Sequence, residues 1–123
     1  MQANLDQLDQ ILGQQVAGLT AIKLSLPKKI ELVKSHRLAE LETFNKREEE
    51  LVVRLQQAES QRQVLLGLIA RDLDLTRTPS LSELVELAPP GARERLTARR
   101  DQLATLAEQI KDGQAMADQL LRV

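Results

Sequence analysis

The 123-residue sequence has no cysteine, tryptophan or tyrosine, and Phe44 is its single aromatic residue. Without cysteine the chain offers no disulfide, no thiol nucleophile and no Cys-ligated zinc site. Aromatic side chains anchor many compact cores, so Leu, Ile, Val and Ala must supply the buried surface here. Such a composition favours long packed helices over a rounded globule.

Long apolar runs and a strong net charge are also missing. The longest apolar stretch, "VLLGLIA" at 64–70, is much shorter than the roughly 18 residues of a membrane span. The first ten residues, "MQANLDQLDQ", show no basic region followed by an apolar run, so no signal peptide is expected. With a net charge of -1, a field that gathers nucleic acid is not expected either. We therefore expect a cytoplasmic protein without a membrane span.

Candidate catalytic residues are few. His36 is the only histidine, and its neighbour Ser35 would not face it in a helix. We interpret His36 as a solvated residue near a helix end. The carboxylates of Glu48 to Glu50 have basic residues within a helical turn, which is typical of a solvated helix face. The sequence thus predicts no enzyme, no catalytic residue, no metal site and no cofactor.

Apolar residues at alternating three- and four-residue steps predict a first helix over about residues 4–34. Its stripe consists of Leu5, Leu8, Leu12, Leu19, Ile22 and Leu26. Pro27 removes a backbone donor and should kink or break this helix, although Ile30 and Val33 keep the rhythm beyond it. A turn near Ser35 would let the next helix fold back as a hairpin.

A second helix over about residues 36–74 shows the clearest pattern in the chain. Its heptad seam consists of Leu41, Phe44, Glu48, Leu51, Leu55, Ala58, Arg62, Leu65 and Ile69. A helix of about 57 Å must lay this seam along a partner of similar length, and the short connection makes the first helix an antiparallel partner. Arg62 lies on the seam with Glu59 one turn before it, so we interpret Arg62 as setting the register of the pair.

The stretch "TRTPSLSELVELAPPGARERL", residues 76–96, predicts a corner between the long helices. Pro79 bars further helix, and Ser80 with Glu83 forms an S-x-x-E capping box. A short helix over about 81–88 should follow, ended by the Pro-Pro-Gly sequence at 89–91, and the last helix should cover about 92–123. The predicted fold is all-α, with one domain over 1–123: an elongated antiparallel hairpin, a short corner helix and a third long helix packed along the hairpin.

The last helix carries two neighbouring apolar stripes. The first consists of Leu96, Leu103, Ala107, Ile110, Ala117 and Leu121. The second consists of Leu106, Gly113, Met116, Leu120 and Val123. Together they span roughly 200°, where one seam needs about 100°. We expect the first stripe to cover the hairpin and the second to lack a partner within the chain, which is typical of a binding surface.

Four segments in this order carry a family resemblance: a leucine-rich first helix, "LVVRLQQAESQRQVLLGLIARDLDL", "TPSLSELVELAPPG" and "LATLAEQIKDGQAMADQLL". Over nearly the whole chain they resemble the FlgN family of flagellar export chaperones. That family often has Asn in its final helix, where this chain has Gln114, Ala117 and Gln119. Contacts made by those Asn side chains are therefore not carried over to this chain.

The resemblance implies a protein that is not an enzyme. Such a chaperone holds hook-associated proteins, which form the hook-filament junction, as unassembled monomers in the cytoplasm and passes them to the flagellar export apparatus. A terminal amphipathic segment of the client could pack on the spare stripe of the last helix. The predicted client-binding residues are Leu106, Ile110, Gly113, Met116, Leu120 and Val123.

Two other functions remain open from the sequence. A structural coiled-coil adaptor fits the same periodicity, and would bind only another copy of itself. A nucleic-acid-binding protein would use the basic cluster between Arg93 and Arg100, although Glu94 dilutes it and no aromatic residue is interleaved for base stacking. The sequence leaves open which hook-associated protein is bound and whether the chain forms a homo-oligomer.

Overall fold

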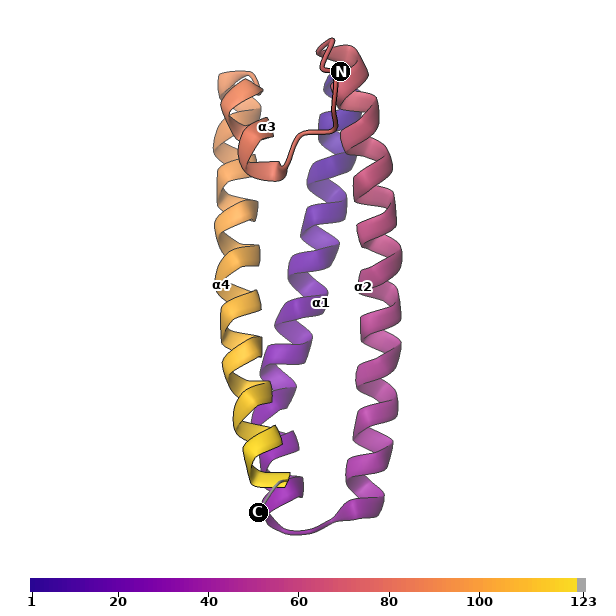
Figure 1. Ribbon diagram of the computed structural model, residues 1–123, viewed down its shortest axis with the longest axis vertical. Coiled ribbons are helices and arrows are strands. Elements are labelled where there is room, and N and C mark those ends of the chain that lie inside the picture. Colours follow the sequence, from indigo (N-terminus) through magenta and orange to yellow (C-terminus); the bar gives the residue numbers. More distant parts are fainter. Residues whose placement is uncertain (122–123) are drawn as a thin grey trace.

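The structure, a computed structural model, describes residues 1–121, except for the side chains of residues 115, 116 and 118–121. The described chain is helical and contains no strand, so the predicted all-α fold is confirmed. The helices are α1 (Gln2–Lys34), α2 (Leu38–Asp72), α3 (Leu81–Leu87) and α4 (Pro90–Leu121). The three long helices run lengthwise beside each other, and α3 lies across one end (Figure 1).

The turn between α1 and α2 lies at Ser35, where the sequence places it. The backbone N–H of Arg37 donates to the carbonyl of Leu32 at 3.1 Å, and that of His36 donates to Val33 at 3.2 Å. His36 takes the left-handed conformation with φ 54°. These two hydrogen bonds around a left-handed residue form a Schellman motif, which ends a helix and reverses the chain.

Pro27 does not interrupt α1, so the expected break is absent. Beyond the proline, Leu32 and Val33 are buried and pack with Leu41 of α2. A proline inside a helix costs about 3 kcal/mol through its missing hydrogen bond and its ring. Packing of the residues that follow it outweighs this cost, which local sequence alone does not reveal.

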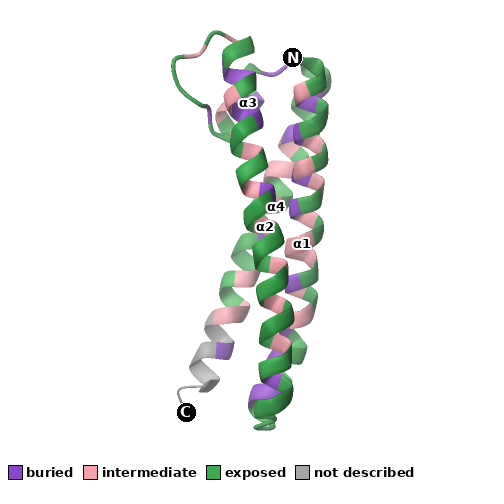
Figure 2. Ribbon diagram, turned by 90° about the vertical axis from the view of Figure 1, so that its right-hand side faces the viewer, coloured by how far each residue is buried: buried purple, intermediate pink, exposed green. Residues whose placement is uncertain are grey.

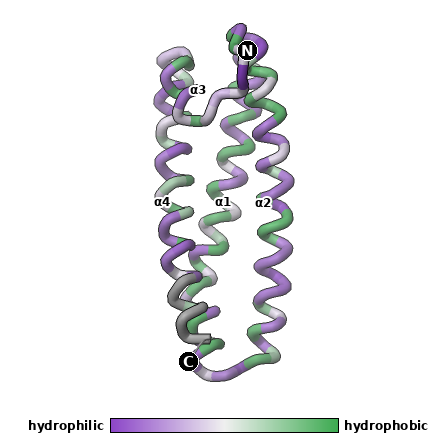
Figure 3. Tube along the Cα trace, in the orientation of Figure 1, coloured by the Kyte–Doolittle hydropathy of each residue, from purple (hydrophilic) through white to green (hydrophobic). Residues whose placement is uncertain are grey.

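The heptad seam predicted for α2 is its inner face. Ala58, Leu65 and Ile69 are buried, and Arg62 is half-buried among them. The Leu55 side chain packs on Gly18 of α1, where a Cβ atom would lie 2.8 Å from Leu55 Cδ2. Hydrophobic and hydrophilic residues alternate along all three long helices, as amphipathic helices require (Figure 3).

The largest core lies at the end of the molecule that α3 covers, and buried positions are frequent there (Figure 2). Leu84 and Val85 of α3 are almost fully buried. The core consists of Leu5, Leu8, Leu12, Leu65, Leu66, Ile69, Leu84, Val85, Ala88, Ala92 and Leu96. The corner helix therefore fixes the start of α4 against the end of the hairpin.

Local capping explains the position of α3. The Ser80 hydroxyl accepts a hydrogen bond from the Glu83 backbone N–H at 3.2 Å, as the capping box predicts. The Glu83 carboxylate, however, accepts hydrogen bonds from the Arg77 guanidinium and the Ser80 hydroxyl. Only half of the predicted capping box is therefore formed.

The last helix begins at Pro90, two residues before its predicted start. Proline is favoured at the first helical position because its missing N–H would have no partner there. The carbonyl of Pro89 accepts from the N–H groups of Ala92 and Arg93, at 3.0 and 2.9 Å. The two prolines thus separate α3 from α4 and also start α4.

Helix α1 is the centre of the arrangement. Both α2 and α4 pack against it, whereas the backbones of α2 and α4 do not approach each other in the part of the chain that the structure describes. The two outer helices stand apart on either side of α1 (Figure 1). A groove can therefore form between them, with α1 as its floor.

Candidate functional site

The predicted client-binding surface lies on the C-terminal half of α4. Leu106 is buried and Ile110 is half-buried. A Cβ atom on Gly113 would overlap Leu26 Cδ1, so α4 approaches α1 closely at that glycine. The expectation that this stripe has no partner within the chain is therefore wrong for Leu106 and Gly113.

The remaining members of this surface are not described. The side chains of Met116 and Leu120, and the whole of Val123, lie outside the described residues. Among the residues that are described, α1 covers the border between the two stripes of α4 rather than the first stripe alone. Leu103 and Ala107 of the first stripe consequently lie at the edge of this contact, facing a groove.

This groove lies between α2 and α4 and has a volume of about 330 Å³. Its apolar residues are Leu19 of α1, Val52 and Leu55 of α2, and Leu103 and Ala107 of α4. Its polar residues are Gln15, Gln56, Glu59 and Arg62. The groove therefore has apolar walls and a polar end.

The polar end is a hydrogen-bonded cluster that joins α2 to α1. One Arg62 nitrogen, Nη2, donates to Glu59 Oε1 at 2.8 Å, and another, Nη1, donates to Gln15 Oε1 at 3.4 Å. Gln15 is buried, and its amide nitrogen donates to Glu59 Oε2 at 2.9 Å. These contacts are the kind that a register-setting Arg62 needs, and its role stays a prediction.

The charge state of Glu59 follows from the same contacts. Partial burial by itself would raise the pKa of Glu59, because it disfavours the charged carboxylate. Hydrogen bonds from Gln63 and Gln15 and the positive charge of Arg62 together outweigh burial, so the pKa of Glu59 lies below its ordinary value. Glu59 is therefore a carboxylate that the fold stabilises in its ionised form.

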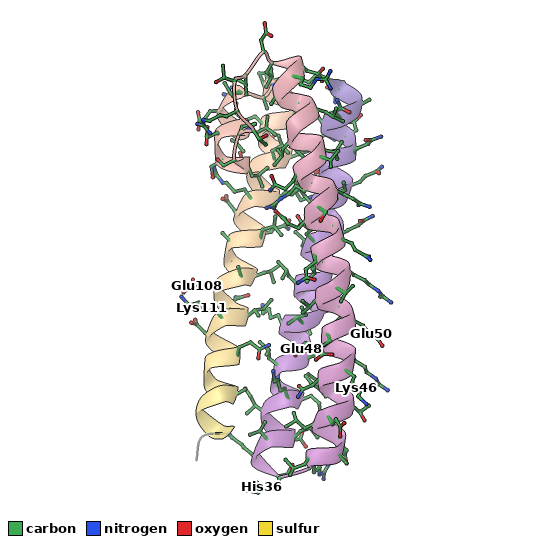
Figure 4. All side chains as sticks on the ribbon, turned by 45° about the vertical axis from the view of Figure 1, so that its right-hand side comes forward. His36, Lys46, Glu48, Glu50, Glu108 and Lys111 are labelled. Atoms are coloured by element: carbon green, nitrogen blue, oxygen red, sulfur yellow. The ribbon has the colours of Figure 1, made fainter. Side chains whose placement is uncertain are left out.

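A second polar cluster joins all three long helices. The ammonium of Lys29 donates to Gln114 Oε1 at 2.6 Å and lies 3.4 Å from Glu48 Oε1. The Gln114 amide nitrogen donates to the same Glu48 oxygen at 3.0 Å. Glu48 lies on the inner side of α2, whereas Lys46 and Glu50 extend outward (Figure 4). The cluster bridges α4 to α2 at Glu48, which lies one helical turn before Val52 on α2.

This second cluster corrects two interpretations of the sequence. The solvated-face interpretation is wrong for Glu48, whose side chain is 16% exposed, although Glu49 and Glu50 are exposed. Gln114 makes an inter-helix contact at a position for which none was carried over. The signal for Glu48 was present, because it falls on the heptad seam of α2.

The basic cluster at the start of α4 is engaged within the chain. Arg93 donates to the carbonyls of Glu86 and Ala88 at the end of α3. The other three pairs are Arg95 with Asp6, Arg99 with Asp9 and Arg100 with Asp101, at 3.8, 3.2 and 3.2 Å. All four guanidinium groups thus have acceptors in this chain, which disfavours a phosphate-binding face.

Residues 1–121 also offer little chemistry of other kinds. No group of three or more His, Cys, Asp or Glu side chains that could hold a metal ion occurs among the side chains that the structure describes. Ser35 donates its hydroxyl to the Glu31 carbonyl at 2.7 Å, and His36 is exposed in the turn. None of the helices in this part of the chain is long and apolar enough to cross a membrane.

The family model described as FlgN protein matches residues 1–123. No curated protein and no solved structure matches the chain. The matched range includes all four helices and both polar clusters.

Proposed function

Because this chain belongs to the FlgN family of flagellar export chaperones, we propose that it binds hook-associated proteins, prevents their premature assembly in the cytoplasm and delivers them for export. Family membership confirms the resemblance found in the sequence, and the match over residues 1–123 is the observation that carries the proposal. Two statements go beyond family membership and are proposed here. The first is that the clients are hook-associated proteins, and the second is that this protein delivers them to the export apparatus.

Packing of the described helices supports a role in holding another helix. Beyond Leu106, α4 stays packed on the hairpin, and Ala117 is fully buried. Other described residues of this half of α4 also contact the hairpin. They include Gly113 against Leu26 and the polar cluster around Gln114. The groove between α2 and α4 leaves room for a further helix beside these contacts.

We assign the residues of this surface two kinds of role. Ile110, Met116, Leu120 and Val123 are proposed to contact the client directly. Leu106 and Gly113 pack on α1, so their proposed role is to set where this half of α4 lies. The client would contribute a terminal amphipathic segment, whose apolar stripe packs on α4.

The alternative of a coiled-coil adaptor differs in its partner, which would be only a second copy of the chain. Family membership favours the chaperone, because it implies flagellar proteins as partners. Nothing in the basic cluster favours nucleic-acid binding, since its arginines are already paired. No second function is therefore proposed.

Calorimetric titration with the C-terminal peptide of a hook-associated protein from the same organism tests the proposal. Leu120→Ala should weaken binding by about 1–3 kcal/mol if Leu120 is a central contact. Leu24→Ala is a matched control, because Leu24 is 72% exposed on α1, and should leave the affinity unchanged. Thermal melts establish that both variants are folded. Unchanged affinity of folded Leu120→Ala would contradict the assigned surface.

A further inference from the structure

The outer face of α2, opposite the seam that packs on α1, carries a second stripe of side chains. This outer stripe consists of Glu50, Val53, Gln57, Val64, Leu68 and Arg71. At 100° per residue these positions fall within about 60° of the helix circumference. All six residues are exposed, with Val53 at 51% and Val64 at 65%, and Glu50 extends outward from α2 (Figure 4). The outer stripe is therefore accessible to another molecule.

The middle of the outer stripe carries no charge. Among residues 55–70 only Glu59 and Arg62 are charged, and both belong to the polar cluster with Gln15 of α1. The exposed face of an amphipathic helix is normally rich in charged side chains, whereas the centre of a protein interface is depleted of them. Exposed valines with no charged residue among them therefore indicate a contact surface.

The two ends of the outer stripe carry opposite charges. Glu50 lies at one end and Arg71 at the other, about 31 Å apart along the helix. Neither side chain forms an ion pair with the residues that the structure describes. A second copy of α2 that runs antiparallel would bring Arg71 to Glu50 at both ends, whereas a parallel copy would bring like charges together. The charges therefore fit a second copy in one orientation.

The uncharged residues match in the same antiparallel arrangement. A twofold axis between Ser60 and Gln61 that pairs Glu50 with Arg71 also places Val53 opposite Leu68 of the second copy. Gln57 then lies opposite Val64 of the second copy. The axis repeats each contact, as at any isologous interface, so the largest apolar side chains of the stripe all lie within the contact.

A hollow on α2 lies where this arrangement places a side chain. It is lined by Lys46, Glu49, Glu50, Val53, Arg54 and Gln57. Four of these residues, between Glu50 and Gln57, have the i, i+3, i+4, i+7 spacing of the hole that receives a side chain in a coiled coil. Leu68 of the second copy, opposite Val53, is the side chain that would enter this hole.

We propose that the outer stripe of α2 binds a second copy of this chain, as an antiparallel pair of α2 helices with ion pairs between Glu50 and Arg71 at both ends. Val52, which lines the groove between α2 and α4, lies about 130° round the helix from the middle of the stripe. The pair therefore leaves the groove and α4 uncovered. This surface is separate from the proposed client contacts and does not depend on them.

The pair should be weak. Each copy contributes one helix and three large apolar side chains, Val53, Val64 and Leu68, and small contacts of this kind are typical of transient interfaces. We expect a Kd of about 0.1 mM. At micromolar concentrations each copy would therefore meet its client as a monomer.

Charge reversal tests the pairing by sedimentation equilibrium of the full chain between about 10 µM and 1 mM. Glu50→Arg and Arg71→Glu should each weaken dimerisation at least about tenfold, because each places like charges together at both ends. The double variant should return to within about threefold of the wild type, because its charges are again opposite. Glu108→Arg makes the same charge change on the outward side of α4 (Figure 4) and should leave dimerisation unchanged. Thermal melts establish that the variants are folded.

A wild-type chain that stays monomeric at about 1 mM would overturn the proposal. A dimer that the single reversals do not weaken, or that the double reversal does not restore, would also overturn it. Affinity for the C-terminal peptide of a hook-associated protein should be unchanged in Glu50→Arg. Loss of that affinity together with a monomeric wild type would show that the client occupies the stripe instead of a second copy.

Single cysteines test the alignment, since the natural chain has none. A mixture of Val53→Cys and Leu68→Cys copies, oxidised by oxygen with a copper catalyst, should form a disulfide between the two copies. Val52→Cys mixed with Leu68→Cys is the control, because Val52 faces the groove, and should react at least about tenfold more slowly. Val53→Cys copies that cross-link with each other faster than with Leu68→Cys would show a parallel pair and overturn the arrangement.

Discussion

At the scale of single residues, partly buried polar side chains are predicted to fix the register of the helices, which leucine packing alone leaves open. Leucines pack in several registers, whereas the pairs Arg62 with Gln15 and Lys29 with Gln114 are predicted to fit only one alignment of the helices. The sequence indicated Glu59 as the partner of Arg62, because the two are three residues apart on one helix. It did not indicate Gln15, because that contact joins residues 47 positions apart.

Glu59 should contribute to stability only where it is ionised. Its folded-state pKa lies below the reference value of 4.5, so its contribution is present above that pH and is lost as the pH falls through the folded-state pKa. Glu59→Gln should lower stability at about pH 7 and show a smaller further loss between about pH 6 and pH 3 than the wild type. Thermal melts across this range measure the effect.

Glu83 also contributes to the acid-induced loss of stability, because a hydrogen bond from Arg77 lowers the pKa of its carboxyl group. The acid-induced loss should therefore shrink in Glu59→Gln without disappearing. Glu49→Gln, at an exposed position of α2, is the control for removing one glutamate charge without removing the contacts of Glu59. If the Glu59→Gln curve ran parallel to that of the wild type, the inferred pKa shift would be wrong.

Replacing His36 with glycine should stabilise the protein. It has φ 54° at the hairpin turn, and the left-handed conformation costs a residue with a Cβ atom about 1 kcal/mol. His36→Gly should therefore raise the free energy of unfolding by up to about 1 kcal/mol, less the entropy that glycine adds to the unfolded chain. Urea denaturation measures it. Lys28→Gly, at an exposed position inside α1, should lower stability by about 1 kcal/mol, and equal losses in both variants would contradict the Schellman turn.

At the scale of the helices, periodicity predicted which elements exist, and tertiary contacts decided the rest. The seam of α2 was predictable because each of its positions packs inward at the expected step. The unbroken course of α1 through Pro27 was not, since it depends on contacts of Leu32 and Val33 with the other helix. Likewise, the apolar arc of α4 was evident, but which part of it contacts α1 depends on how Gly113 meets Leu26.

Gly113 and Gly67 should respond to alanine in opposite directions. At Gly67 a Cβ atom would meet nothing within 4 Å, so Gly67→Ala should stabilise the protein by about 0.5–1 kcal/mol through the helix propensity of alanine. At Gly113 the Cβ would overlap the buried Leu26, and overpacking of about 1–3 kcal/mol should exceed that gain. Urea denaturation compares them. Equal stabilisation by both substitutions would show that α4 does not approach α1 at Gly113.

At the scale of the whole molecule, the described apolar core clusters lie towards the two ends. One core lies under α3 and a smaller one lies at the hairpin turn, formed by Leu32, Val33 and Leu41. Between them, the groove separates the outer helices above the polar bridge at Glu48. The sequence predicted the elongated bundle but not this open side.

The central claim is that the protein holds a hook-associated protein as a monomer. Size-exclusion chromatography with light scattering, on a full-length hook-associated protein from the same organism with and without the chaperone, measures this directly. The account predicts a complex whose mass contains one client chain, formed at the expense of client multimers. A client whose elution and mass are the same with and without the chaperone would contradict the claim.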